Sequence, residues 1–444
     1  MKFNVRALVF LGLLAIAVAA VLLVPERASA IPRFAARTGM ACIQCHINPS
    51  GGGMRNEYGR NVFERSMLPM GRFDRRWLTA DDEPAAPPAS TDSGAGAAPA
   101  EAEEPETPTN PLVNFTGDIT DWLAIGADFR TAYIHVRPDR GFAPGTEPNV
   151  TNSFFLMQSD LYVGATLNDN LRFVIDLGVY SGFEGWGLFN LTGDPNLELY
   201  VKVGRFMPTF GIREVEHQLF TREGIGLGAT DRDTGVEATL MLGPLTANLA
   251  VTNGTLGDTP FDTHGGDRRE FEKAITSRLA ASMHFAGIRL QLGASASWNQ
   301  GVSQANPMFG SSLPEALAGE TTQGLDELRL GGFATANVGR FTWLGDLVWA
   351  RDAFYSDKLA PISGYASYQE LSFVVTRGFD LVTTFEFMDP DVEVVDNRLI
   401  RAGFVAEIFP WPYVEFRAMV RRFWADQSAT GGAWDVVLFA HLFM

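Results

Sequence analysis

The feature that most constrains the fold of this chain is a regular alternation of apolar and polar side chains between residues 112 and 444. In the segment 433–444, apolar side chains occupy every second position: Trp434, Val436, Leu438, Ala440, Leu442 and Met444. In the segment before it, one face carries Val414, Phe416, Ala418 and Val420, and the other carries Glu415, Arg417, Met419 and Arg421. A period of two residues is typical of β-strands. A membrane barrel and a soluble β-sandwich both show it, so alternation alone does not distinguish them.

The lengths of the connections separate these two classes. We expect about sixteen strands, at 119–135, 153–166, 169–180, 183–191, 196–206, 233–243, 244–253, 272–285, 287–299, 325–338, 340–352, 363–376, 378–388, 397–409, 413–424 and 433–444. Tight connections fall at 168–170, 193–195, 243–244, 286–287, 339–340, 377–378 and 410–412. Between them lie mostly longer polar loops, notably 207–232, 254–271 and 300–324. Short turns on one side, long loops on the other and an even strand number are typical of bacterial outer-membrane barrels.

Aromatic residues near the strand ends agree with this interpretation, because outer-membrane barrels carry aromatic girdles at both membrane interfaces. They include Phe341, Trp343, Trp349, Phe409, Trp411, Tyr413 and Trp424. The predicted fold class is therefore all-β: an antiparallel transmembrane β-barrel of about 16 strands over residues 112–444, in contact with the lipid of the bacterial outer membrane.

Three segments precede the barrel. Residues 1–30 have a basic start, an apolar run and Ala28-Ser29-Ala30, which is typical of a signal peptide; an uncleaved membrane anchor is the alternative. Residues 31–80 form a basic head with eight arginines and three acids, a balance of +5. Residues 81–111 are rich in Ala and Pro, with eight acids and no Lys or Arg, which predicts a disordered acidic linker. The barrel region holds 24 basic and 40 acidic residues, so we expect it to attract the head.

Both cysteines of the chain lie in Cys42-Ile43-Gln44-Cys45-His46, which matches C-x-x-C-H, the attachment signature of c-type haem. Two thiols three positions apart reach both vinyl groups of one porphyrin, and the adjacent imidazole then reaches the iron. The motif predicts one covalent haem c in a small N-terminal cytochrome c-like head, with His46 as the proximal ligand. A disulfide redox pair and half of a zinc site are the alternatives; the first usually needs a thioredoxin-like fold, and the second needs more ligands close by.

The second axial ligand is open. Three methionines follow the motif within reach: Met54, Met67 and Met70. Each is also an ordinary packing residue. A second imidazole would have to come from the barrel, from His135, His217, His264, His284 or His441. The glycines at 51–53 permit a close approach of the chain to a haem edge, and Arg55 and Arg60 are candidates to pair with the haem propionates.

Inside the barrel, the strand pattern places charged side chains of both signs toward the lumen, which predicts a wet interior. These are Asp380, Glu386, Arg401, Glu407, Glu415, Arg417 and Arg421. The loop 207–232 is the third outward loop, and by analogy with general porins we expect it to narrow the lumen or to contact the head. Within it, Glu214, Glu216 and His217 could bind ferrous iron; a salt-bridged loop is the alternative.

The N-terminal motifs resemble those of a known family. They are Phe34-Ala35-Ala36-Arg37-Thr38-Gly39-Met40 before the C-x-x-C-H motif, then Pro49, then Tyr58-Gly59-Arg60 and Phe63. This arrangement resembles the fused cytochrome–porin proteins of bacterial outer membranes, whose best-known members are iron oxidases. The resemblance covers residues 31–65 at motif level and the barrel only in architecture. It implies a haem at or inside the barrel that relays electrons between an outside donor and periplasmic cytochromes.

We therefore expect an electron carrier rather than a dedicated catalyst. This carrier would exchange electrons with periplasmic c-type cytochromes and with an extracellular donor or acceptor. Fe(II) oxidation is one form of this activity. The head is expected in the periplasm or in the barrel lumen. The alternatives are a diffusion porin for small solutes whose haem head gates or senses, and a periplasmic haem protein with a soluble β domain. No nucleic-acid partner is expected.

Overall fold

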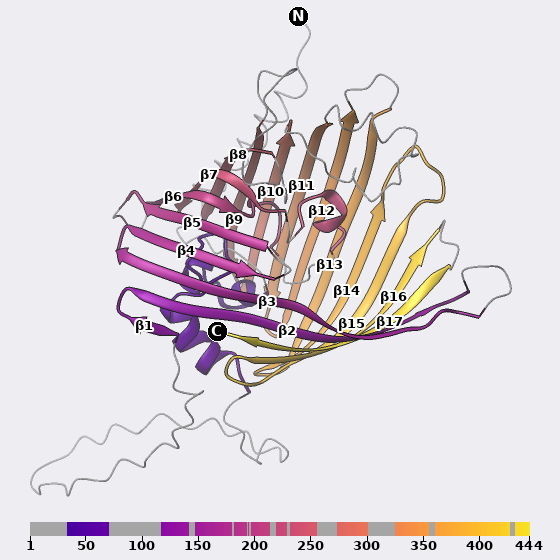
Figure 1. The fold of residues 1–444 in the computed structure, drawn as a ribbon, viewed down its shortest axis with the longest axis horizontal. Coiled ribbons are helices and arrows are strands. Elements are labelled where there is room, and N and C mark those ends of the chain that lie inside the picture. Colours follow the sequence, from indigo (N-terminus) through magenta and orange to yellow (C-terminus); the bar gives the residue numbers. More distant parts are fainter. Residues whose placement is uncertain are drawn as a thin grey trace, which may run out of the picture.

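The computed structural model describes residues 33–70, 117–141, 147–179, 182–192, 194, 197–213, 219–228, 231–254, 273–300, 325–354, 360–426 and 431–444 (Figure 1). The predicted signal peptide (1–30) and the predicted linker (81–111) lie outside these residues, as do Glu214, Glu216, His217 and His264. Their predicted roles stay predictions.

Sixteen long strands form one closed antiparallel sheet. They are β2 (Leu123–Pro138), β3 (Thr151–Asn168), β4 (Leu171–Gly178), β5 (Gly182–Asn190), β6 (Leu197–Phe206), β7 (Asp233–Leu242), β8 (Leu245–Thr252), β9 (Ala274–Phe285), β10 (Ile288–Asn299), β11 (Leu325–Val338), β12 (Phe341–Phe354), β13 (Ile362–Thr376), β14 (Phe379–Asp389), β15 (Leu399–Trp411), β16 (Val414–Ala425) and β17 (Gly432–Phe443). Each pairs with the next, and β17 pairs back with β2 from Ala433↔Pro138 to Phe443↔Asp128. The short β1 (Asp118–Thr120) pairs with the start of β2. The predicted barrel of about 16 strands is confirmed.

The tight connections lie together at one end of the barrel. Gly339 and Gly378 adopt positive φ angles of 55° and 74° there, a conformation that permits a very short turn and that other residues rarely adopt. At Gly378 the space is also filled, because an added Cβ would lie 2.6 Å from the backbone nitrogen of Met70. This turn end therefore contacts the N-terminal part of the chain.

The outer wall is apolar and the inner wall is polar. On β17, Trp434, Leu438 and Leu442 are 50%, 47% and 51% exposed, whereas His441 between them is 3% exposed. The same exposure of large apolar side chains recurs on the other strands. A soluble protein does not expose so large an apolar surface, and a closed barrel leaves no backbone group unpaired in hydrocarbon. The chain is therefore a membrane-spanning barrel, which excludes a soluble β domain.

Residues 33–70, called the plug below, lie inside the turn end of the barrel (Figure 1, indigo). The plug contains α2 (Arg33–Thr38), the 3-10 turn η1 (Cys42–Gln44) and the π-helix η2 (Gly59–Met67). Within the described ranges, no helix has both the length and the apolar character needed to cross a membrane.

Charge complementarity holds the plug against the barrel wall. Arg33 forms ion pairs with Glu370 on β13, at 2.8 Å, and with Glu407 on β15. Arg37 pairs with Asp380 on β14 at 2.6 Å. All three acids are buried. The expected attraction between the basic head and the acidic barrel is thus realised as direct contacts.

The predicted wet interior needs correction. The seven predicted lumen residues do point inward, but each is buried, with Glu386 2% and Arg401 7% exposed. Glu386 and Arg401 pair with each other at 2.7 Å. The strand pattern predicts which face a side chain occupies, but it does not predict that protein rather than water will cover that face.

The loop between β6 and β7 is part of the protein that covers the inner wall. It is called the third loop below, and the structure describes its residues 207–213 and 219–228. Its Phe210, Ile225 and Leu227 pack against residues on β12, β13 and β14, which lie far around the ring from β6 and β7. The Gly211 amide donates to Ser295 Oγ at 2.9 Å, and Arg329 donates to the Ile225 carbonyl at 2.7 Å. The loop therefore crosses and narrows the lumen, as predicted.

Arg222 fixes the shape of the third loop, since its guanidinium donates to the carbonyls of Phe210 and Ile212. We expect Arg222→Met to lower the free energy of unfolding by about 1–3 kcal/mol, because two carbonyls would lose their donor. Urea unfolding in lipid vesicles measures this. Arg351→Met, at an exposed position, is the control, and equal stability of the two variants would contradict the assignment.

Candidate functional site

The C-x-x-C-H motif forms a tight turn. The amide of His46 donates to the Cys42 carbonyl at 2.8 Å, and that of Cys45 donates to the same carbonyl at 3.0 Å. Asn56 Nδ2 donates to the Ile43 carbonyl at 2.7 Å, which ties the turn to the chain before η2. Gly59 packs directly on the carbonyl of Cys45 and leaves no room for a Cβ. The turn is therefore held from both sides within the plug.

The three glycines after the motif all adopt left-handed φ angles, of 84°, 72° and 62° at Gly51, Gly52 and Gly53. A Cβ at Gly51 would lie 2.8 Å from Cys42 Sγ, and one at Gly52 would lie 2.5 Å from Arg213 Nε. A Cβ at Gly53 would meet nothing within 4 Å. The glycines thus let the chain pass close to a motif cysteine and to an arginine of the third loop.

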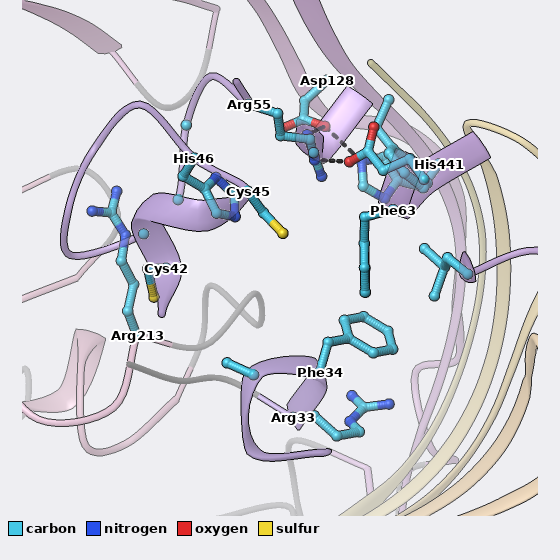
Figure 2. A pocket seen from close by; sticks show the side chains of 18 of the residues that line it. Arg33, Phe34, Cys42, Cys45, His46, Arg55, Phe63, Asp128, Arg213 and His441 are labelled. Carbon is cyan, nitrogen blue, oxygen red and sulfur yellow. Dashed lines mark hydrogen bonds and ion pairs between the residues drawn. The ribbon is translucent and has the colours of Figure 1, made fainter. Parts of the chain in front are cut away.

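The motif faces a cavity of about 270 Å³ between the plug and the barrel wall (Figure 2). Cys42, Cys45 and His46 line one side of it. Figure 2 shows Phe34 and Phe63 across the cavity from the two cysteines, with Asp128 and His441 at its upper edge. The cavity therefore joins all three chemically distinctive residues of the motif to the inner face of β2 and β17.

One wall of the cavity is aromatic. The Phe34 ring packs edge-on against Phe63 and Phe409, with centroids 5.7 and 5.8 Å apart, and Phe409 packs against Phe443 in the same way at 6.4 Å. Two of these rings belong to the plug and two to the barrel. Such a wall excludes water and suits a flat apolar ligand.

Another wall is a hydrogen-bonded polar chain. His441 contacts Asp128 Oδ1 through Nε2 at 2.9 Å and Glu415 Oε2 through Nδ1 at 2.8 Å. Tyr162 donates to Asp128 Oδ2 at 2.8 Å. Both ring nitrogens of His441 are therefore engaged, and neither is available as an axial ligand in this arrangement.

Burial sets the protonation of the motif. It raises the pKa of Cys42 to about 12 and that of Cys45 to about 11, so both thiols are protonated at neutral pH. Burial, with the charges of Arg55 and Arg213, lowers the pKa of His46 to about 3, so the imidazole is neutral and keeps a lone pair. In thiol–disulfide catalysts the attacking cysteine has a lowered pKa, whereas burial here raises the pKa of both thiols.

The residues present fit a c-type haem. The two thiols are not joined to each other, and both line the cavity. His46 Nδ1 is buried without a hydrogen-bond partner, which is costly unless another group uses it or the ring reorients on binding. In the part of the chain that the structure describes, no group of three or more His, Cys, Asp or Glu residues is arranged for a metal ion. The zinc alternative therefore lacks its further ligands there.

The three predicted distal methionines do not line this cavity. Met54 is 2% exposed and packs with Ile47 and Tyr162 beside Gly164. Met67 is exposed and accepts from Tyr58 Oη at 3.5 Å, and the Met70 amide donates to the Phe409 carbonyl. Their assignment as axial ligands stays a prediction. Ligation by a second imidazole from the barrel also stays a prediction.

Two other barrel histidines also lie apart from the motif cavity. His135 is hydrogen-bonded to Asn152 at 2.6 Å, and His284 lines a separate small hollow at the β9–β10 turn.

Met40 does line the motif cavity. Its place two residues before Cys42 carried no sequence signal of its own beyond the family resemblance.

The arginines chosen from the sequence to bind haem propionates already have carboxylate partners. Arg55 pairs with Glu64 and approaches Asp128 at 3.6 Å, and Arg60 pairs with Asp118. Of these two arginines, Arg55 lines the cavity and Arg60 does not. The cavity instead receives Arg213, which the sequence reasoning missed because it lies far from the motif along the chain.

The solved structures that this chain is similar to share only its general shape. No protein-family model and no curated protein matches the chain. The anion-selective porin from Comamonas acidovorans is 11% identical with a TM-score of 0.49, over 72% of this chain and 99% of that porin. Pseudomonas putida OprB is 10% identical with a TM-score of 0.49, over 73% and 94%, and OmpT of Vibrio cholerae is 10% identical with a TM-score of 0.47, over 72% and 97%. The assignment of the barrel rests on its own strand pairing.

The glycine pair Gly51 and Gly53 offers a test of the plug. We expect Gly51→Ala to cost about 1–3 kcal/mol of plug stability, because a Cβ would strain the left-handed backbone and crowd Cys42 Sγ. Gly53→Ala introduces the same backbone strain, but its Cβ meets no neighbouring atom, so the loss of plug stability should be smaller. Hydrogen exchange of residues 33–70 measures both, and equal losses would contradict the described contact.

Proposed function

We propose that this chain is an outer-membrane electron-transfer protein, in which a haem c bound at Cys42, Cys45 and His46 sits within a porin-like barrel. The observation that carries the proposal is that both thiols and the imidazole line a single cavity enclosed by the plug and the barrel wall. Haem c, when bound, supplies a one-electron Fe(III)/Fe(II) couple.

The chain's own residues supply the environment of that couple. Cys42 and Cys45 hold the group to the plug, and His46 binds it as a neutral imidazole. Phe34, Phe63 and the barrel rings exclude water from one side. The buried ion pairs of Arg33 and Arg37 fix the plug, so the motif keeps one position relative to the wall.

The position of the plug supports exchange with a periplasmic partner. The plug lies at the end with the tight turns, where Met70 contacts Phe409 and Gly378, and short turns in outer-membrane barrels face the periplasm. We infer that periplasmic c-type cytochromes are the partners on that side. An extracellular donor or acceptor, with Fe(II) as one candidate, completes the proposed relay.

A diffusion channel for small solutes is the alternative, since the porin-like barrel favours it. The plug and the third loop argue against an open passage, because together they bury the charged inner wall. A haem-bearing head that gates the channel is the form of this alternative that accommodates the motif.

The first test concerns attachment. We expect outer membranes containing the wild-type protein to show covalent haem staining at its mass and a reversible one-electron titration, and the Cys42→Ala/Cys45→Ala variant to show neither. Ser66→Ala, at an exposed site of the plug outside the cavity, is the control and should keep both signals. Pigment and redox activity retained in the double cysteine variant would refute the proposal.

The second test concerns passage of solutes. We expect the full chain in planar bilayers to conduct poorly, and a variant lacking residues 33–70 to conduct several-fold more, because the plug occupies the turn end of the lumen. The Gly53→Ala protein, which keeps the plug, is the control. High conductance of the full chain with attached haem would favour the diffusion channel over the electron relay.

A further inference from the structure

Arg213 lies where the barrel meets the motif. It extends from the third loop to line the motif cavity, and its guanidinium rests on Gly52, which has no Cβ to obstruct it. Figure 2 shows Arg213 alongside the turn that carries Cys42 and His46.

Three other arginines around the cavity have carboxylate partners. Arg33 pairs with Glu370 and Glu407, Arg55 with Glu64, and Arg232 with Glu184 at 3.0 Å and Asp176 at 3.6 Å. Arg213 differs from them. Among the residues that the structure describes, no carboxylate forms an ion pair with it, and Glu184, with which it interacts electrostatically, is already paired with Arg232.

The side chain is nevertheless well positioned. The residue before it, Ile212, has its amide bonded to Asp346 on β12 at 3.3 Å and its carbonyl bonded to Arg222. The Gly211 carbonyl accepts from Arg278 at 2.9 Å. A guanidinium on a fixed backbone, half-buried beside a cavity and with no carboxylate partner in the described ranges, is suited to bind an anion from that cavity.

We propose that Arg213 binds a carboxylate of the group held in the cavity, which on the proposed function is a haem propionate. This inference rests on that function and deepens it, because it makes the third loop of the barrel part of the cofactor site. It transfers to Arg213 the role that sequence reasoning gave to Arg55 and Arg60. It also means that the barrel, and not the plug alone, sets the reduction potential of the bound iron.

The test uses the full-length protein with its attached haem. Loss of a positive charge beside the iron favours the oxidised form, so we expect Arg213→Gln to lower the midpoint potential. A tenfold shift of the oxidised-to-reduced ratio corresponds to about 59 mV for one electron, and we expect a shift of this order. Arg213→Lys keeps the charge and should restore most of the wild-type potential. Gly52→Ala, which displaces the guanidinium, should shift the potential in the same direction as Arg213→Gln.

Arg351→Gln is the matched control, because it removes the same charge at an exposed position on β12 away from the cavity. A normal heat-induced shift of the folded barrel on gels verifies that each variant is folded. If haem is attached and Arg213→Gln has the same potential as Arg351→Gln, the role of Arg213 is wrong and the proposed function stands. If the wild-type protein carries no haem, the proposed function fails and this inference fails with it.

Discussion

The pairing of β17 with β2 is the interaction on which the rest of the structure depends. In hydrocarbon, an unpaired backbone amide or carbonyl costs several kcal/mol, so a sheet with open edges is not viable there. Joining the last strand to the first removes both edges. Because the ring is closed, its large apolar side chains can face the lipid, and polar side chains are confined to the interior, where other parts of the chain supply partners for several of them.

Ion pairs, and not apolar packing alone, hold the plug inside the barrel. The inner wall offers carboxylates on β13, β14 and β15, and α2 of the plug offers Arg33 and Arg37 in return. Burying an ion pair is favourable only when its partners are well placed, and removing one partner leaves a costly charge behind. The plug and the wall are therefore matched surfaces, and the motif inherits its position from that match.

Sequence patterns predicted what is local and missed what is distant. The strands could be located because inward and outward side chains alternate along each strand, and the C-x-x-C-H turn could be found because its chemistry lies within five residues. The contacts that enclose the cavity join residues hundreds of positions apart, such as Arg33 and Glu407, and leave no periodic trace. Arg213 was missed for the same reason, as was the dry packing of the predicted lumen residues.

The closing seam of the ring is also part of the candidate site. Asp128 and Arg130 come from β2, the first strand of the ring, and His441 and Phe443 come from β17, the last, yet all four border the same cavity. During assembly, this side of the pocket does not exist until the two ends of the sheet meet. Completion of the membrane wall and completion of the ligand chamber are thus one event, and a barrel that fails to seal would lack a finished chamber as well.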